Sequence, residues 1–150
     1  MVPLLGALLA AGCLAAAPTT ADDAQEALVH HFTERVGDGP WEAICLSREA
    51  GAGQEGEETY LRRFEGHPLP VVAARLCDGA GDGSFGWIVE ESSRVAIQMA
   101  VGPVRRNLDG SLLGTVRTST GTIDATEYDC TLVLVDGAWK VEECVATVTT

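Results

Sequence analysis

The chain has 150 residues, 46% of them hydrophobic and 21% charged, a composition that excludes a disordered protein and fits one globular domain. It carries 22 acidic residues against 10 Lys and Arg, so its net charge is −12. The resulting field repels a phosphate backbone and an anionic lipid surface. We therefore expect no nucleic-acid partner, and contact with a membrane only through a lipid anchor.

The first 17 residues contain no charged side chain, but they are too few for a membrane span, which needs about 20 apolar residues. Leu4–Ala11 instead matches the apolar core of an export signal. The following segment from Leu9 to Cys13, LAAGC, resembles the bacterial lipobox, in which the cysteine is acylated. We predict that residues 1–12 are a signal peptide, that Cys13 is lipidated, and that residues 13–21 are a tether on the extracytoplasmic face of the cell membrane.

Two alternatives stay open for this segment. Cleavage by an ordinary signal peptidase before Asp22 would give a plainly secreted protein, and an uncleaved segment would be a buried N-terminal helix. In either exported form, residues 22–150 are the single folded domain.

Helices are predicted first along this domain. Apolar residues at helical spacing favour a helix that begins near Asp22 and ends at Gly37, with Ala24, Leu28 and Phe32 inward. Further helices are predicted from Pro40, over Glu57–Phe64 and over Leu69–Leu76, with a Gly-rich loop over Ala50–Gly56.

The periodicity changes from helix to strand after Gly83. Alternating apolar residues predict strands around Trp87 and Val89, over Val95–Val101, and after the Asp109–Gly110 turn. The longest hairpin runs through Asp136–Gly137, from Thr122–Val135 to Ala138–Val148. Helices followed by an antiparallel meander predict an α+β domain in which the helices pack against a curved antiparallel sheet.

Five cysteines are present, and removal of Cys13 from the folded domain leaves four, which in an exported chain predicts two disulfides with three possible pairings. We favour Cys130–Cys144, because both flank the Asp136–Gly137 turn, and Cys45–Cys77 follows by elimination. A two-residue turn places Cys130 opposite Glu143, so the bridge requires either a longer loop or one extra residue, a β-bulge, which we place at Glu142–Glu143. Free buried thiols are the alternative. Neither a cofactor nor a metal site is predicted, because the spacing typical of zinc ligands is missing.

Three features resemble the nuclear-transport-factor-two-like superfamily, whose fold is a cystatin-like cone, and in particular its small actinobacterial lipoproteins. They are the N-terminal amphipathic helix, the junction over Gly37–Cys45 and the terminal hairpin over Leu132–Val141, LVLVDGAWKV. The resemblance implies a strongly curved sheet wrapped around the first helix, with a pocket at the wide end of the cone.

Candidate pocket residues are His31, Tyr128 and Trp139, although Trp139 and His31 also fit simple core packing. Tyr128 and Cys130 share one parity, so we expect the acids Glu127 and Asp129 to face water. We expect His67 to be exposed in a turn. Asp124, His30, Arg105 and Arg106 are further ionisable candidates.

The sequence contains no nucleophile elbow, no Walker loop and no metal-binding pair of histidines, so we assign no catalytic residues. Two functions stay open. The first is a non-enzymatic surface protein that binds an unknown partner protein or a small apolar ligand in the cone or at its acidic rim. The alternative is a small enzyme of isomerase or dehydratase type, which an inward carboxylate in an apolar surround would favour.

Overall fold

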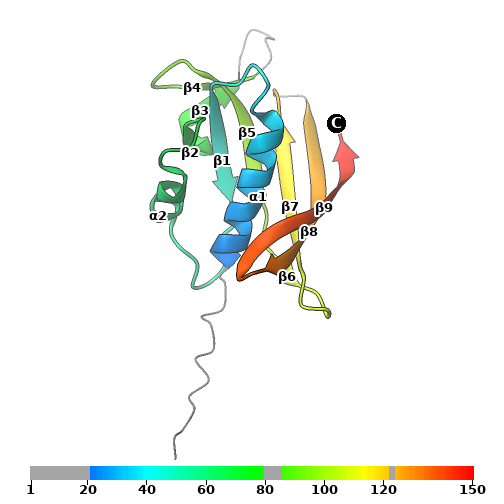
Figure 1. Cartoon of the computed structure of the whole chain (residues 1–150). Helices are drawn as coiled ribbons and strands as arrows, with labels where there is room; N and C mark the ends of the chain where they lie inside the picture. Colours follow the sequence, from blue (N-terminus) through cyan, green and yellow to red (C-terminus); the bar gives the residue numbers. More distant parts are fainter. Residues whose placement is uncertain (1–20, 80–85, 122–123) are drawn as a thin grey trace, which may run out of the picture.

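The computed structural model describes residues 21–79, 86–121 and 124–150 (Figure 1). The predicted signal peptide, Cys13 and the tether up to residue 20 lie outside the described residues. The described part contains one long helix, short helical turns and a mixed sheet of nine strands. The α+β class predicted from the sequence is therefore confirmed.

Two of the predicted helices begin close to where the sequence places them. Helix α1 spans Ala21–Val36 and α2 spans Glu57–Leu61, which a 3-10 turn over Arg62–Phe64 continues. A second 3-10 turn covers Ala74–Leu76. Among the described residues, no helix has the length and apolar character needed to cross a membrane.

Nine strands form the sheet. Their bounds are β1 Ala43–Arg48, β2 Val71–Ala73, β3 Cys77–Gly79, β4 Trp87–Val89, β5 Val95–Val101, β6 Arg105–Arg106, β7 Leu112–Ser119, β8 Ala125–Val135 and β9 Ala138–Thr149. The main order across the sheet is β2-β1-β5-β7-β8-β9, with the β3–β4 hairpin and β6 attached to its sides. Helix α1 lies across one face of this sheet (Figure 1).

Two of the predicted helices are wrong, and with them the prediction that the whole sheet is antiparallel. The segment after Pro40 forms β1, which pairs in parallel with both β2 and β5. Ala43–Leu46 is buried at every position, because β1 is central and covered on both faces. Such a short apolar run satisfies helical spacing as well as it satisfies a buried strand. In the same way, Leu69–Leu76 forms β2 and a 3-10 turn.

The main core lies between α1 and the sheet. Leu28 and Phe32 of α1 are buried in one cluster with Ile97, Val116 and Leu132 of the strands. Gly114 on β7 makes this approach possible, since a Cβ there would lie 2.7 Å from the Leu28 side chain. The predicted inward face of α1 is therefore confirmed.

A smaller core lies on the opposite face of the sheet. Cys45 and Ala96 alternate with the residues that face α1, and Val89 of the β3–β4 hairpin covers them. The Cys45–Cys77 disulfide joins β1 to β3 inside this cluster, with the two Cα atoms 6.3 Å apart. The bridge ties the hairpin to the centre of the sheet.

The terminal hairpin has the predicted register. Asp136 and Gly137 have φ angles of 51° and 80°, as a type I′ turn requires, and Val135 pairs with Ala138. Leu132 pairs with Val141 but Thr131 pairs with Glu143, so Glu142 is the extra residue of a bulge. Cys130 therefore lies opposite Cys144, and the two form a disulfide. A second register shift, near Thr147, was not predicted.

Candidate functional site

A cluster of charged side chains fixes the start of α1 against the sheet. Asp22, in the first turn, and Arg48, at the end of β1, form an ion pair whose two side chains are only about 5% exposed. The Asp22 carboxylate also accepts hydrogen bonds from Gln54 and from the backbone N–H of Glu55. Burial opposes ionisation, but the hydrogen bonds from Arg48, Glu55 and Gln54 outweigh it and hold the pKa of Asp22 below its ordinary value.

This cluster has two consequences for the elements around it. The polar face of α1 is not uniformly solvated, because Asp22, Gln25 and Thr33 are buried. The loop over Ala50–Gly56 is attached to α1 rather than free, since Gln54 and Glu55 contact Asp22. Arg48 also lies over the Tyr60 ring, 3.7 Å from its centroid.

Arg63 forms a second cluster beside the first. Its guanidinium contacts Asp23 at 2.9 Å, Glu26 at 2.5 Å and Glu55 at 2.8 Å. Hydrogen bonds from Arg63 lower the pKa of Glu55, and those carboxylates together raise the pKa of Arg63. The pairing fixes two acids of α1 at the rim of a neighbouring cleft.

That cleft, which we call the α1–β9 cleft, lies between α1 and the first residues of β9 and has a volume of about 670 Å³. Ala27, Trp139 and Val141 are its apolar lining residues nearest the core. The ionisable lining residues are Asp23, Glu26, His30, His31, Glu34 and Lys140. Acids and histidines on α1 thus face an apolar strand.

The structure brings together two of the three predicted pocket residues. His31 and Trp139 both line the α1–β9 cleft, whereas Tyr128 packs behind Phe32, with ring centroids 4.9 Å apart. Phe32 in turn meets the edge of His31 at 5.4 Å. Tyr128 therefore supports the cleft from the core and does not line it.

The two lining residues, His31 and Trp139, have different environments. Burial first, and then the positive charge of Arg35, lower the pKa of His31, so its ring is neutral at pH 7. Trp139 is only 7% exposed, and its indole N–H has no hydrogen-bond partner among the described residues. Trp139 is therefore chiefly a core residue whose edge reaches the cleft.

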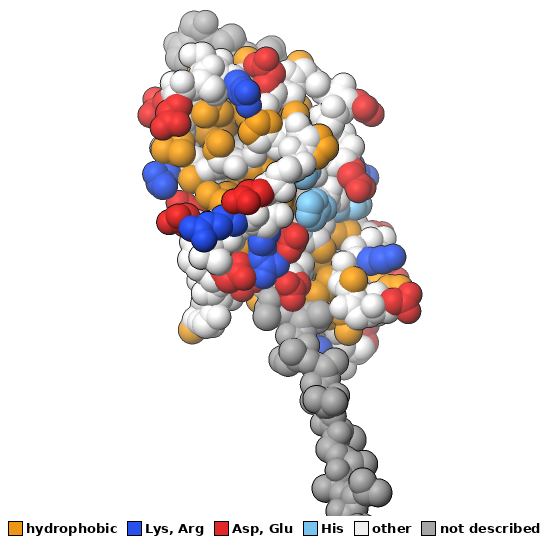
Figure 2. Space-filling model, turned by 60° about the vertical axis from the view of Figure 1, so that its left-hand side comes forward, with side chains coloured by type: hydrophobic (Ala, Val, Ile, Leu, Met, Phe, Trp, Pro, Cys, Tyr) orange, Lys and Arg blue, Asp and Glu red, His pale blue; other side chains and the backbone are white. Residues whose placement is uncertain are grey.

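A second hollow of about 400 Å³ adjoins the cleft and shares His30 and Glu34 with it. His67 lines this hollow, 5.7 Å from His30 between ring centroids. The prediction that His67 is exposed is wrong: it is half-buried, with Nε2 3.1 Å from the hydroxyl of Thr33 and Nδ1 2.9 Å from the Leu69 carbonyl oxygen. Figure 2 shows histidine side chains beside acidic and basic ones on this face.

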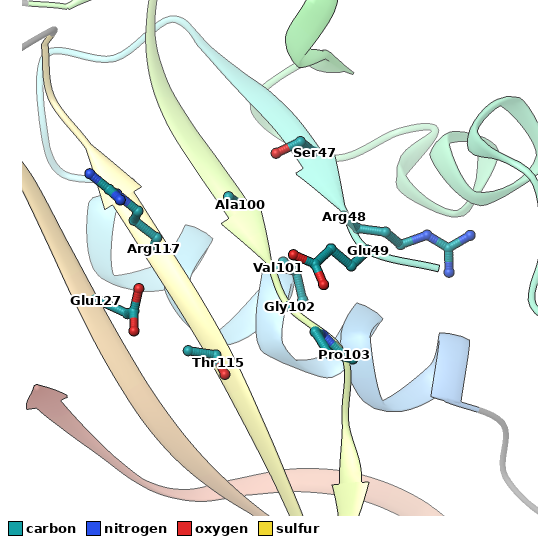
Figure 3. Close-up of a pocket in the computed structure, with 10 residues that line it drawn as sticks. All are labelled: Ser47, Arg48, Glu49, Ala100, Val101, Gly102, Pro103, Thr115, Arg117 and Glu127. Carbon is teal, nitrogen blue, oxygen red and sulfur yellow. The ribbon is translucent and has the colours of Figure 1, made fainter. Parts of the chain in front are cut away.

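The opposite face of the sheet carries a shallow trough of about 360 Å³ (Figure 3). Its lining includes small residues of adjacent strands, Ser47, Ala100 and Thr115, together with Glu49, Arg117 and Glu127. Arg48 extends away from the other lining side chains in Figure 3, because its guanidinium belongs to the buried cluster with Asp22. The trough is an open surface of the sheet with both charged and small apolar lining residues.

The acids of β8 lie where the parity predicts. Asp129 is exposed, and Glu127 lines the outer trough, on the other side of the sheet from the α1–β9 cleft. Asp124 precedes β8, and Arg105 and Arg106 are exposed on β6. None of these residues lines the cleft. The described residues contain no group of three His, Cys, Asp or Glu side chains placed to hold a metal ion.

The sequence does not predict the ion clusters. Arg48 and Arg63 are two of only ten basic residues in this acidic chain, which is the one feature of the sequence that points to them. Comparison of the chain with protein-family models, with curated proteins and with solved structures found no match.

Proposed function

We propose that this protein is an exported, lipid-anchored bacterial protein with a non-enzymatic binding function, and that its ligand site is the α1–β9 cleft. Two disulfides support export, because such bridges persist in oxidising compartments. The segment LAAGC that ends at Cys13 supports acylation at that residue. The chain from Cys13 to Ala21 then serves as the tether.

We also propose the cone of the nuclear-transport-factor-two-like superfamily as its fold. Support comes from a first helix buried against the sheet and from the DGAWKV hairpin, in which Asp136 and Gly137 adopt positive φ angles. Trp139 follows that turn and lines the cleft on the side nearest the core. In such a fold this position is the wide end, where a ligand would enter.

The proposed binding function rests on one observation. The α1–β9 cleft is apolar on the side nearest the core, and the acidic residues that line it lie on α1. Asp23 and Glu26 are paired with Arg63, so neither is an unpartnered base. The β8 acids face the other side of the sheet. This arrangement suits a small apolar ligand, or an apolar side chain of a partner protein, more than proton transfer.

The enzymatic alternative depends on His31. A neutral imidazole at the cleft is a competent general base, and Glu34 lies one helical turn away. If the protein is an isomerase or dehydratase, His31→Gln abolishes turnover of an apolar carbonyl substrate while leaving its binding unchanged. A binding protein shows no turnover in either form.

The anchor is tested by expressing the full chain in a lipoprotein-processing bacterial host. We expect the parent to partition with membranes and detergent, and Cys13→Ser to leave the membrane fraction with loss of the acyl mass. Thr19→Ser, a similarly small change outside the LAAGC segment, is the control. A mature N-terminus at Asp22 in the parent would show plain secretion instead.

The cleft is tested with a neutral apolar fluorophore, N-phenyl-1-naphthylamine, added to the Cys13→Ser chain. We expect Ala27→Phe, which fills the cleft, to weaken binding at least tenfold. Ala100→Phe places the same side chain in the outer trough and should leave binding unchanged. Equal loss in both variants, or none in Ala27→Phe, would exclude the cleft as the site.

A further inference from the structure

The outer edge of β9 is the longest unpaired strand edge in the described part of the chain. Strand β9 runs over Ala138–Thr149 and stands last in the sheet order, so within that part it pairs only with β8. Every residue from Val145 to Thr150 is exposed, and Val145 and Val148 are each 53% exposed. Figure 1 shows this end of the strand, in red, projecting beyond α1.

The backbone of this segment presents free hydrogen-bonding groups. Thr150 and Ala125 exchange two backbone hydrogen bonds, of 2.9 and 3.1 Å, so the N–H of Thr150 faces β8. Bonding directions alternate along an antiparallel pair, and the N–H and C=O of Thr149 therefore face outward. Such an edge is a template for another strand.

The segment lacks two of the features that usually protect an edge. Natural edge strands are shielded by charges, proline, β-bulges or short length. On β9 the charges Lys140, Glu142 and Glu143 all lie in the first half, and residues 144–150 contain neither a charged side chain nor a proline, so the register shift at Thr147 is the only irregularity in this half of the described strand. The opposite edge of the sheet, β2, is only three residues long and directly follows Pro70. The second half of β9 is thus the one long edge left open among the described strands.

We propose that residues 144–150 of β9 pair in antiparallel fashion with the same residues of a second copy of this protein, which continues the sheet across a two-fold axis. The charge pattern of the strand is compatible with self-pairing in this arrangement. Pairing residues 144–150 with themselves places the axis at Thr147, and Glu143 then lies beyond the end of the opposite strand, so no acidic side chain faces another.

The structure favours a second copy over a foreign peptide. An uncharged segment of Val, Ala and Thr offers no charge by which a particular partner would be selected, whereas an identical strand matches it in length and polarity. The Cys130–Cys144 disulfide fixes the base of the segment on β8, which reduces the ordering needed on pairing. Seven paired residues bury less than a standard interface of about 1,600 Å², so the dimer is reversible on dilution.

Sedimentation velocity of the full Cys13→Ser chain over a concentration series tests the proposal. We expect reversible dimerisation in the parent. Val148→Lys adds a charge to the edge, and Thr149→Pro removes an outward donor without loss of a bond to β8. Each should raise the dimer dissociation constant at least tenfold. Val135→Lys changes an exposed valine of β8 beside the turn and should have no effect.

Two further measurements distinguish a weakened interface from a misfolded variant. Recovery of the Cys130–Cys144 cross-link shows that each variant has the native hairpin, and Thr147→Cys places one new thiol at the two-fold axis. We expect Thr147→Cys to form a disulfide-linked dimer on mild oxidation. A parent that remains monomeric at all concentrations, or a dimer weakened equally by Val135→Lys, would overturn the proposal.

Discussion

Asp22 shows how one buried carboxylate links the first helix to the sheet. Its partners Arg48 and Gln54 come from residues 26 and 32 positions later in the chain. Removing one member of a buried ion pair leaves the other charge unpaired, at a cost of about 3 to 5 kcal/mol. We therefore expect Asp22→Asn to lower the free energy of unfolding at pH 7 by about 3 kcal/mol, measured by urea denaturation.

The pH dependence of this effect has a definite sign. The folded pKa of Asp22 is lowered, so its contribution is present above the ordinary aspartate pKa of about 3.9 and is lost as the pH falls through the folded value. The stability difference between the parent and Asp22→Asn should therefore shrink below about pH 4.

Glu58→Gln is the control for Asp22→Asn. It breaks an exposed pair with Arg62 and should lower the free energy of unfolding by less than about 1 kcal/mol. Similar losses in both variants would contradict the structure.

Gly137 is the residue on which the terminal turn depends. Its φ of 80° lies in the left-handed region, where a Cβ costs about 1 to 2 kcal/mol. Gly137→Ala should lower the stability by that amount in urea unfolding. Gly56, with a φ of −68° and open space around it, is the matched control, and Gly56→Ala should have a smaller effect. The reverse order would show that the turn has another conformation.

At the scale of elements, the β8–β9 hairpin depends on one extra residue. Glu142 is unpaired between the Leu132–Val141 and Thr131–Glu143 pairs. Deleting Glu142 leaves Cys144 opposite Cys130 in a regular ladder, so we expect the disulfide to form and the stability to change by no more than about 1 kcal/mol. Peptide mapping without reduction and thermal unfolding measure the two outcomes.

The opposite change is the control for this deletion. An alanine inserted between Glu142 and Glu143 adds a second unpaired residue and moves Cys144 along the strand. We expect slower disulfide formation and a lower melting temperature than in the deletion variant. Loss of the cross-link on deletion, with retention on insertion, would show that the bulge lies elsewhere.

At the scale of the whole molecule, the two disulfides constrain different parts of the chain. Cys45–Cys77 closes a loop of 32 residues between the centre of the sheet and the β3–β4 hairpin, and Cys130–Cys144 closes one of 14 residues already joined by a tight turn. Loop entropy then predicts that replacing both cysteines of a bridge by alanine lowers the free energy of unfolding, by about 4 kcal/mol for the longer loop and about 3 kcal/mol for the shorter one. Calorimetry should find the lower melting temperature in the Cys45→Ala, Cys77→Ala variant, and the opposite order would contradict this account.

Much of the site follows from long-range contacts that local sequence does not encode. Spacing on α1 correctly placed His31 near the apolar stripe, and the turn correctly placed Trp139 on the other strand of the hairpin. Tyr128 has the inward parity that was predicted, but Phe32 separates it from the cleft. Arg63 lies 40 and 37 residues from Asp23 and Glu26, and their contact exists because the α2 segment returns to α1.

Sequence alone determined the features whose causes lie within a few residues of one another. These are the apolar stripe of α1, the Asp136–Gly137 turn, the register that it imposes and the disulfide that this register allows, because each depends on local backbone geometry and side-chain periodicity. Only the tertiary structure decided that Ala43–Arg48 is a strand. A six-residue apolar run fits either conformation, and the neighbours β2 and β5, distant in sequence, supply the hydrogen bonds and the two buried faces that make it a central parallel strand.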